Sequence, residues 1–460
     1  MNELTSRDNI IHRSKYTACV PYKDTGLYLV YSFLTKKFAL LTEKQKEILD
    51  QPTEHLSSGA VPALLQLGFL SGKDEYALLL EKLRKRNPPV PQNTGLALEI
   101  CPTMHCNFDC RYCYEAGRRH TGSMDDETLE AVAEFTRKRI LETRATRLSV
   151  KWFGGEPTLA FGQVQRLSDR LIAIAKTCGI PYRATIQTNG YLLTQEMVDR
   201  FKEKQISSME ITIDGNKLSH DRLRVLHDGS GSYDRIMENL SRLRTDIPIR
   251  IRCNLHKDNI GAFADLMKEI DRLKELTHNT LLCTPRIIRV EPNLPEDGRF
   301  LKDTALTNDE YLTLFNSLYS MNDHADQPRR QDFDNFTKSV VAPCRACNGT
   351  GFTIDELGNL YCCNMEVGDP DLAIGNVRDY ENDTSLKHTK SFEFYRRSLC
   401  TDREQCKNCV ILPTCLGRCP RTWNQFYDCE WLKVNLAETM VKVYDSLNAI
   451  QAVKPEDQQS

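Results

Sequence analysis

The sequence lacks long apolar runs and has no marked excess of charge of one sign. No stretch approaches the roughly 18 consecutive apolar residues that a membrane-spanning helix needs. Residues 1–9 have none of the apolar core of a signal peptide. The 61 basic and 63 acidic side chains leave a formal net charge of −2, which gives no electrostatic reason to expect a nucleic-acid or membrane partner. These absences predict a cytoplasmic protein.

Cysteine, by contrast, is abundant and unevenly placed. The chain has 18 cysteines; four lie between residues 101 and 113, and ten lie between 344 and 429. In a reducing compartment such clusters favour metal ligands over disulfides. The remaining cysteines are scattered, and we interpret them as ordinary buried or surface thiols. They are Cys19, Cys178, Cys253 and Cys283.

The first cluster contains three closely spaced cysteines, Cys106, Cys110 and Cys113. They would place three thiolates on one tight loop, one fewer than a closed tetrahedral metal site needs. A [4Fe–4S] cluster held by three cysteines keeps one iron without a protein ligand, where chemistry can occur. A zinc site would normally use four ligands, built as two separated cysteine pairs. The spacing therefore predicts an iron–sulfur site that a small molecule completes.

The chain divides into five predicted regions. Two short strands and helices at 1–90 suggest a small winged-helix-like module, and its hairpin would span 28–34 and 37–41. A basic, proline-rich linker at 84–94 leads into alternating strands and helices over 91–300. A charged bridging region, a cysteine-rich and turn-rich domain, and a C-terminal helix with a polar tail follow. These span 301–340, 341–435 and 436–460.

The alternating region predicts an α/β fold with a parallel sheet and outer helices. About six strand–helix units are too few for a full eight-stranded barrel, so we expect an open, partial (β/α)6 TIM-like barrel. The strand candidates are 95–101, 147–153, 182–187, 208–213 and 247–253, with a weaker sixth at 286–291.

Polar side chains and glycines follow the predicted strands, where parallel barrels place their active sites. Paired glycines permit close approach of a ligand, and Glu156 offers a partner for an ammonium group. Amide, hydroxyl and carboxylate groups on later strands suit a ribose or a carboxylate, and Tyr112 suits an adenine face. Arg250, Arg252 and Asn254 alternate, so they should share one face. The residues predicted to contact such a ligand are Tyr112, Gly154, Gly155, Glu156, Asn189, Thr212, Asp214 and Asn254.

Residues 101–260 resemble the radical S-adenosylmethionine (SAM) superfamily. Cys106, Cys110 and Cys113 match its cluster signature, and Gly154-Gly155-Glu156-Pro157 matches its SAM-amine motif. The resemblance implies that SAM chelates the open iron and is cleaved reductively to a 5′-deoxyadenosyl radical, which abstracts hydrogen from a substrate. His220-Asp-Arg-Leu-Arg224 resembles a segment of the peptide-modifying branch, which implies that Arg224 lies near SAM.

The late cysteines resemble the SPASM domain, which holds two auxiliary [4Fe–4S] clusters. The resemblance implies one set of ligands at Cys344, Cys347, Cys363 and Cys419, and another at Cys406, Cys409, Cys415 and Cys429. Cys362 is an alternative to Cys363, although the spacing from Gly358 favours Cys363. Cys400 has no role in the pattern. A domain stapled by zinc is the alternative reading of the same cysteines.

Three functions remain open. The first is a radical SAM peptide maturase that binds the leader of a ribosomally made precursor, through an edge strand near Tyr28, and takes electrons from a flavodoxin or ferredoxin. The second is an anaerobic sulfatase-maturing enzyme, which makes formylglycine. The third is a non-catalytic zinc or iron–sulfur protein. The sequence names no general base and no modified residue.

Overall fold

The computed structural model describes most of the chain in two compact units. The described residues are 10–86, 92–118, 122–287, 304, 306, 310, 313–314, 334, 336–338, 345–387, 389, 392–393, 404–416 and 435–452. Within them, the first unit draws on 1–88, 312–344 and 397–460, and the second on 89–311 and 345–396. The predicted domain boundaries stay predictions.

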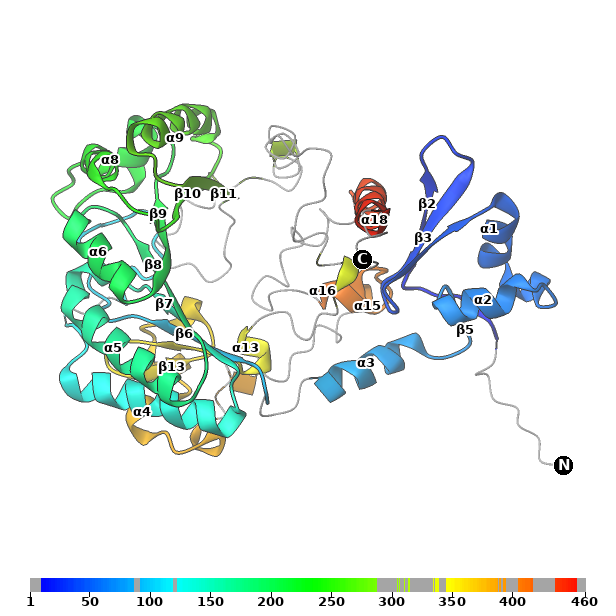
Figure 1. Ribbon diagram of the computed structural model, residues 1–460, viewed down its shortest axis with the longest axis horizontal. Coiled ribbons are helices and arrows are strands. Elements are labelled where there is room, and N and C mark those ends of the chain that lie inside the picture. Colours follow the sequence, from blue (N-terminus) through cyan, green and yellow to red (C-terminus); the bar gives the residue numbers. More distant parts are fainter. Residues whose placement is uncertain are drawn as a thin grey trace, which may run out of the picture. The chain divides into compact units, whose positions relative to one another are not determined.

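The second unit is built around six parallel strands that neighbour one another in chain order. Helices follow the strands and lie along the outer side of the sheet (Figure 1). This is the partial TIM-like barrel that the alternating pattern predicts. The strands are β6 (Gly95–Ile100), β7 (Arg147–Trp152), β8 (Tyr182–Thr188), β9 (Ile206–Thr212), β10 (Ile249–Leu255) and β11 (Leu281–Ile287). The helices are α4 (Asp126–Thr143), α5 (Phe161–Thr177), α6 (Gln195–Glu203), α7 (Lys217–Leu223), α8 (Tyr233–Arg242) and α9 (Phe263–Thr277), with 3-10 turns η2 (Pro157–Ala160) and η3 (Ile260–Ala262).

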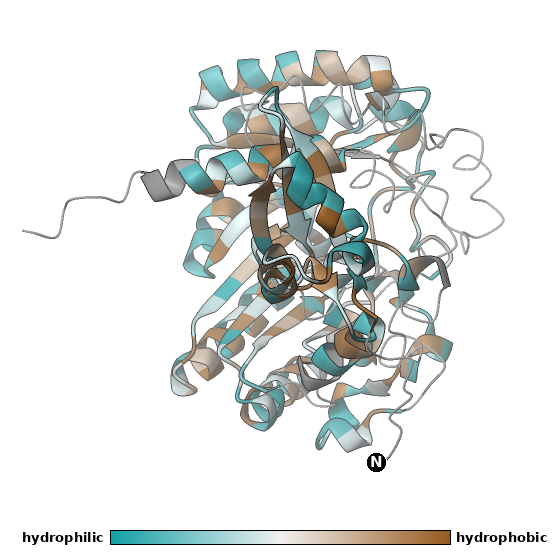
Figure 2. Cartoon of the chain, turned by 90° about the vertical axis from the view of Figure 1, so that its right-hand side faces the viewer, coloured by the Kyte–Doolittle hydropathy of each residue, from teal (hydrophilic) through white to brown (hydrophobic). Residues whose placement is uncertain are grey.

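Alternation along the strands separates an apolar face from a polar one. Leu96, Leu98 and Ile100 of β6 are buried, whereas Glu99 is half-buried. The helices alternate hydrophobic and hydrophilic residues along their length (Figure 2), so each can place an apolar stripe on the sheet. The polar residues of the strands are left on the opposite, inner face of the barrel.

The sixth strand lies earlier than the sequence predicted. We expected it at 286–291, but β11 spans Leu281–Ile287, and residues 288–291 lie outside the described part of the chain. Pro285 sits inside β11 and pairs in register with Cys253. Proline cannot donate to a ladder, so it normally excludes a central strand, but β11 is the last strand of its sheet and tolerates it.

A hairpin from the cysteine-rich region extends the same sheet beyond β6. Strand β12 (Gly351–Ile354) pairs with β6 in parallel, and β13 (Asn359–Tyr361) and β14 (Gly375–Asn376) follow as antiparallel neighbours. Since Ile354 pairs with Ile100, β12 ends at the same edge of the sheet as β6. The short elements of this region are α13 (Arg345–Asn348), η5 (Asn364–Glu366), η6 (Pro370–Leu372), η7 (Val377–Asp379) and η8 (Asp383–Ser385).

The first unit contains a three-stranded antiparallel sheet, and one expectation about it is wrong. The predicted hairpin is present as β3 and β4, but β2 pairs with the other side of β3, so Tyr28 lies in the central strand and not at an edge. The edges are β2 and β4. The strands are β1 (His12–Arg13), β2 (Thr17–Tyr22), β3 (Leu27–Ser32), β4 (Lys37–Leu41) and β5 (Leu70–Ser71). The helical elements are α1 (Glu43–Asp50), η1 (Pro52–His55), α2 (Ala60–Leu67), α3 (Glu75–Arg86), α15 (Glu404–Lys407), α16 (Leu412–Cys415) and α18 (Leu436–Ala452).

Both faces of this small sheet are covered. Ile48 and Leu49 of α1 join Val30 and Leu41 in one buried cluster. Helix α18 also contacts the sheet: the hydroxyl of Tyr22 donates to Asp445 at 2.8 Å. None of the helices in the described ranges combines the length and apolar character that crossing a membrane requires.

Candidate cofactor site at the carboxyl edge of the barrel

The loop that carries Cys106, Cys110 and Cys113 follows β6 and is fixed on one side by the turn after β7. The amide of Gly155 donates to Thr103 O at 3.2 Å, and the amide of Glu156 donates to His105 O at 2.8 Å. A Cβ on Gly155 would lie 2.1 Å from His105 O, so only glycine fits there. The two backbones pack directly against each other, and the Gly154-Gly155 pair thereby sets the position of the cysteine loop.

The other side of the loop is fixed by the segment after α7. Asp109 N donates to Val225 O at 2.8 Å, and Arg111 N donates to Leu223 O at 3.0 Å. The ring of His227 donates through Nε2 to Cys106 O at 2.7 Å, since a carbonyl oxygen can only accept. The cysteine loop is therefore held from both sides by this chain's own backbone.

The three thiols differ in their exposure. Cys106 is buried, and Cys110 and Cys113 are half-buried. The amide of Phe108 donates to Cys106 Sγ at 3.5 Å. Across the described residues, no three histidine, cysteine or acidic side chains are arranged as a metal site. The ligand role of these cysteines stays a prediction that rests on their spacing and chemistry.

Glu156 ties the ends of β7 and β8 together. Its buried carboxylate accepts four hydrogen bonds: from Thr158 N at 3.0 Å, Thr158 Oγ1 at 2.6 Å, Thr188 Oγ1 at 2.6 Å and Asn189 N at 2.6 Å. Burial raises the pKa of Glu156, and these four donors oppose that rise. Sequence reasoning did not find Thr188, because a threonine at a strand end is typical of any sheet.

Four of the predicted SAM contacts gather in a second network. The hydroxyl of Tyr112 donates to Asp214 Oδ2 and accepts from Arg224 at 2.8 Å and from Asn254 Nδ2 at 3.1 Å. The backbone amide of Asn254 donates to Asp214 Oδ1 at 2.8 Å. The hydroxyl of Tyr112 thus contacts polar groups of its own chain. The contact between its ring and an adenine stays a prediction. Thr212 has no hydrogen bond in either network among the described residues.

Buried His220 positions this second network. Its Nδ1 accepts from the amide of Asp214 at 3.2 Å, while Nε2 lies 3.0 Å from Ser232 Oγ. Burial lowers the pKa of His220 well below its ordinary value, and Arg224 lowers it further, so the ring is neutral. Burial also disfavours the charge on Arg224, but Cys110, Tyr112 and Asp214 together outweigh it and raise the Arg224 pKa.

The inner face of the barrel carries charges on successive strands. As predicted, Arg250, Arg252 and Asn254 share a face: Arg252 Nε donates to Asn254 Oδ1 at 3.0 Å, and Arg250 Nε donates to Ser208 at 3.3 Å. Arg252 also lies 3.6 Å from Glu210 of β9. This polar lining lies below the two networks and suits a polar substrate better than an apolar one.

Glu356 is a buried acid that the sequence did not single out. It follows β12 at the edge where the cysteine loop begins, is 3 % exposed, and neither carboxylate oxygen has a hydrogen-bond partner in the described ranges. Burial is the main cause that raises the pKa of Glu356 to about 7, and Asp355 and Glu115 add to it. Its position in a turn, Asp355–Gly358, resembled an ordinary solvent-exposed loop.

The late cysteines lie on short turns. Cys347 lies in α13, and Cys363 is half-buried beside the buried Cys362. Cys409 N donates to Cys406 O at 3.0 Å, and Cys415 ends α16. Cys344, Cys419 and Cys429, together with Cys400, lie outside the described residues. Both proposed auxiliary ligand sets therefore stay predictions.

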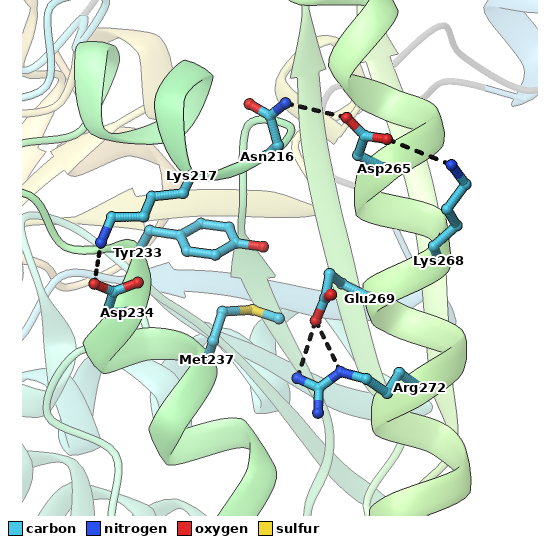
Figure 3. Close-up of a pocket in the computed structure, with 9 residues that line it drawn as sticks. All are labelled: Asn216, Lys217, Tyr233, Asp234, Met237, Asp265, Lys268, Glu269 and Arg272. Atoms are coloured by element: carbon cyan, nitrogen blue, oxygen red, sulfur yellow. Dashed lines mark hydrogen bonds and ion pairs between the residues drawn. The ribbon is translucent and has the colours of Figure 1, made fainter.

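A pocket of about 510 Å³ lies apart from these networks, on the outside of the barrel among α7, α8 and α9 (Figure 3). Its charged side chains are paired with one another: Lys217 with Asp234, Lys268 with Asp265, and Arg272 with Glu269. None of the predicted site residues lines it. It is a surface groove of mutually satisfied ion pairs.

Comparison with known proteins agrees with this geometry. Residues 100–270 match the family model of the radical SAM superfamily. This part of the chain is a radical SAM domain. It contains the cysteine loop, the Gly154–Glu156 turn and both hydrogen-bond networks.

The alignments with known relatives extend well beyond residues 100–270. The cysteine-type anaerobic sulfatase-maturating enzyme of Clostridium novyi is 25 % identical over 347 residues, which cover 71 % of this chain and 88 % of the relative. The radical SAM cyclopropyl synthase TigE of Paramaledivibacter caminithermalis is 21 % identical over 423 residues, 86 % of this chain and 83 % of the relative. The solved structure of native anSMEcpe with bound AdoMet and Cp18Cys peptide has a TM-score of 0.58 at 20 % identity, and covers 76 % of this chain and 99 % of that chain. That likeness shows the shared fold.

A radical SAM domain binds SAM and a [4Fe–4S] cluster, and the residues present fit both groups. Three thiols suit three irons of the cluster and leave the fourth for SAM. Within the described part of the chain, two buried donors near the loop, Asn107 Nδ2 and Arg224 Nε, have no hydrogen-bond partner. Such donors are costly unless a bound group satisfies them. Cys106, Cys110 and Cys113 would hold the cluster, and the Glu156 and Tyr112 networks would border SAM.

Proposed function

We propose that this protein is a peptide maturase that uses radical SAM chemistry to modify a ribosomally made precursor peptide. The bound cluster and SAM supply a 5′-deoxyadenosyl radical that abstracts a hydrogen atom from the substrate. The modification would be a redox-neutral epimerisation, or an oxidation such as a cross-link. When the product is oxidised, the electron left on the substrate would pass to an auxiliary cluster held by the late cysteines.

The chain's own residues have separate tasks in this proposal. The backbone contacts at Gly155 and Leu223–Val225 hold the cysteine loop in place before any cofactor binds. The Tyr112–Asp214 network and Glu156 border SAM, and their hydrogen bonds hold the Tyr112 hydroxyl and both carboxylates in place. The charged inner face, with Glu210 and Arg252, would orient a polar peptide segment.

One observation supports the choice of a peptide substrate: anSMEcpe, which shares this fold with a TM-score of 0.58, holds a bound Cp18Cys peptide in its solved structure. The alignment with the cyclopropyl synthase TigE covers 86 % of this chain, so the likeness reaches beyond the radical SAM domain. The similarity to a sulfatase-maturating enzyme covers 71 %. Residues 17–41 form a separate sheet whose β2 and β4 edges offer main-chain groups for pairing with a leader peptide. Because Tyr28 lies in the central strand, we place the pairing at β2 or β4 and not at Tyr28.

The second candidate is an anaerobic sulfatase-maturing enzyme. It is favoured by the similarity to the Clostridium novyi enzyme and by the TM-score of 0.58 with anSMEcpe. On this architecture the substrate would be a Cys or Ser side chain in a sulfatase, oxidised to formylglycine. The third candidate, a non-catalytic zinc or iron–sulfur protein, does not explain why the Glu156 and Tyr112 networks lie at the strand ends beside the cysteine loop.

A peptide assay separates the candidates. The reconstituted enzyme is incubated anaerobically with SAM, dithionite and either the short peptide encoded beside its gene or a sulfatase-derived Cys peptide. Mass spectrometry should show a modified precursor peptide and an unchanged sulfatase peptide. Formylglycine on the sulfatase peptide would establish the second candidate, and modification of neither peptide would contradict the maturase proposal.

A further inference from the structure

A chain of amide hydrogen bonds fixes the orientation of Asn107, the residue after the first cluster cysteine. The backbone amide of Tyr191 donates to Asn189 Oδ1 at 3.0 Å. A backbone N–H can only donate, so this contact identifies the oxygen of the Asn189 amide. The Nδ2 of Asn189 then donates to Asn107 Oδ1 at 2.7 Å. Asn107 must therefore turn its own Nδ2 away from Asn189.

The relay ends in a donor without an acceptor. Asn107 Nδ2 is buried and has no hydrogen-bond partner among the residues that the structure describes. Leaving a buried donor unsatisfied costs on the order of 1–3 kcal/mol. Asn189 is 5 % exposed, and it follows β8 beside the turn that holds the cysteine loop. The fold thus keeps an amide donor in a dry position next to Cys106, oriented by a backbone group two residues beyond Asn189.

We propose that Asn107 donates from Nδ2 to an anionic acceptor that the cofactors bring to this loop. The acceptor is either a sulfur of the cluster bound at Cys106 or the carboxylate of SAM; both are anionic and both belong at this position. A donor to cluster sulfur stabilises the reduced cluster and raises its reduction potential. A donor to the carboxylate tightens SAM binding. The inference rests on the cofactor site of the proposed function and not on its peptide substrate.

The test uses the reconstituted enzyme and two readouts that do not depend on turnover. The variant Asn107→Leu removes the donor without adding charge. The potential of the cluster is measured without SAM by EPR-monitored titration, and the SAM dissociation constant by equilibrium dialysis. A cluster acceptor predicts a roughly tenfold less favourable reduction, a fall of about 59 mV for one electron. A SAM acceptor predicts an unchanged potential and a roughly tenfold larger dissociation constant.

A second variant keeps the test decisive if Asn107→Leu does not load its cluster. Asn189→Asp leaves residue 107 intact but puts a carboxylate oxygen where Asn189 Nδ2 was. That oxygen can only accept, so the Asn107 amide turns around and donates to it from Nδ2. The Oδ1 of Asn107 then occupies the place from which Nδ2 donated to the cofactor. Gln187→Glu adds the same charge two residues earlier on β8, outside the relay. The change in cluster potential or in SAM dissociation constant should be larger for Asn189→Asp than for Gln187→Glu. Equal shifts in these two variants, or unchanged potential and SAM affinity in Asn107→Leu, would overturn the proposal.

Discussion

Two residues at the barrel edge have properties that their type alone does not indicate. Gly155 is a structural contact of the cysteine loop, because His105 O occupies the place of a side chain. Glu156, which the sequence predicts to receive the SAM ammonium, already accepts four hydrogen bonds from neighbouring strand ends. The sequence could place both residues at the site, since strand ends converge, but the partners come from loops whose packing a pattern does not reveal.

The first prediction concerns Gly155. The variant Gly155→Ala places a Cβ 2.1 Å from His105 O, so either the turn or the cysteine loop must shift. We expect at least a fivefold loss of iron bound at the first cluster, measured as SAM-dependent change in the EPR signal of the reduced protein. Gly162→Ala in α5 is the control, because nothing lies within 4 Å of its Cβ. Full loading of Gly155→Ala would show that the close approach is not needed.

The second prediction concerns Glu356. Its pKa is raised to about 7 in the folded protein, so the fold favours the protonated acid. The wild type therefore loses stability as pH rises from the unfolded pKa, near 4.5, through the folded pKa near 7, and the loss is complete above it. Glu356→Gln should be more stable than wild type by up to about 3 kcal/mol at pH 8.5, with little difference at pH 4.5. Urea unfolding at both pH values measures this; a constant difference would contradict the buried-acid account.

Among the elements, α4 anchors the hairpin region to the barrel through one buried arginine. Arg139 is fully buried and donates to Asp383 at 2.9 Å, to the hydroxyl of Tyr380 at 3.1 Å and to Gly349 O at 3.2 Å. Glu142 lies 2.8 Å from it. A single charge thus joins α4 to the segments on both sides of β12.

The third prediction follows from this anchor. Arg139→Met leaves the half-buried Glu142 and Asp383 without their cation, and breaking a pair around a buried charge typically costs up to about 3–5 kcal/mol. Guanidinium unfolding should show that loss. Arg137→Met on the exposed side of the same helix removes only the surface pair with Glu134 and should cost no more than about 1 kcal/mol. Equal effects of the two substitutions would show that burial of Arg139 does not matter.

The elements show how far sequence patterns reach. Apolar runs identified the strands from β6 to β10 within a few residues, because each is a buried parallel strand. The sixth strand was predicted too far towards the C-terminus, at 286–291, whereas β11 spans Leu281–Ile287 and includes Pro285, a residue that is unusual inside a strand. The pairing of β12 with β6 joins residues about 250 apart in sequence, and no local pattern encodes such a contact. The central position of β3 was missed because β2 (Thr17–Tyr22), which directly precedes it in the chain, was not predicted as a strand.

For the whole molecule, the account rests on the radical SAM domain, which the family match and the barrel geometry both support. The alignments with the sulfatase-maturating enzyme and with TigE cover 71 % and 86 % of this chain, more than the radical SAM domain alone. With three [4Fe–4S] clusters, the reconstituted protein would hold about 12 irons. Zinc in place of iron at the late cysteines would refute the two auxiliary clusters but leave the first site untouched.

The most direct test of the central claim is reductive cleavage of SAM. The reconstituted protein, with dithionite and SAM under anaerobic conditions, should release 5′-deoxyadenosine, quantified by liquid chromatography. The triple variant Cys106→Ala, Cys110→Ala and Cys113→Ala should release none, yet keep the iron bound by the late cysteines. Absence of 5′-deoxyadenosine from the iron-loaded wild type, or its undiminished release by the triple variant, would contradict the account.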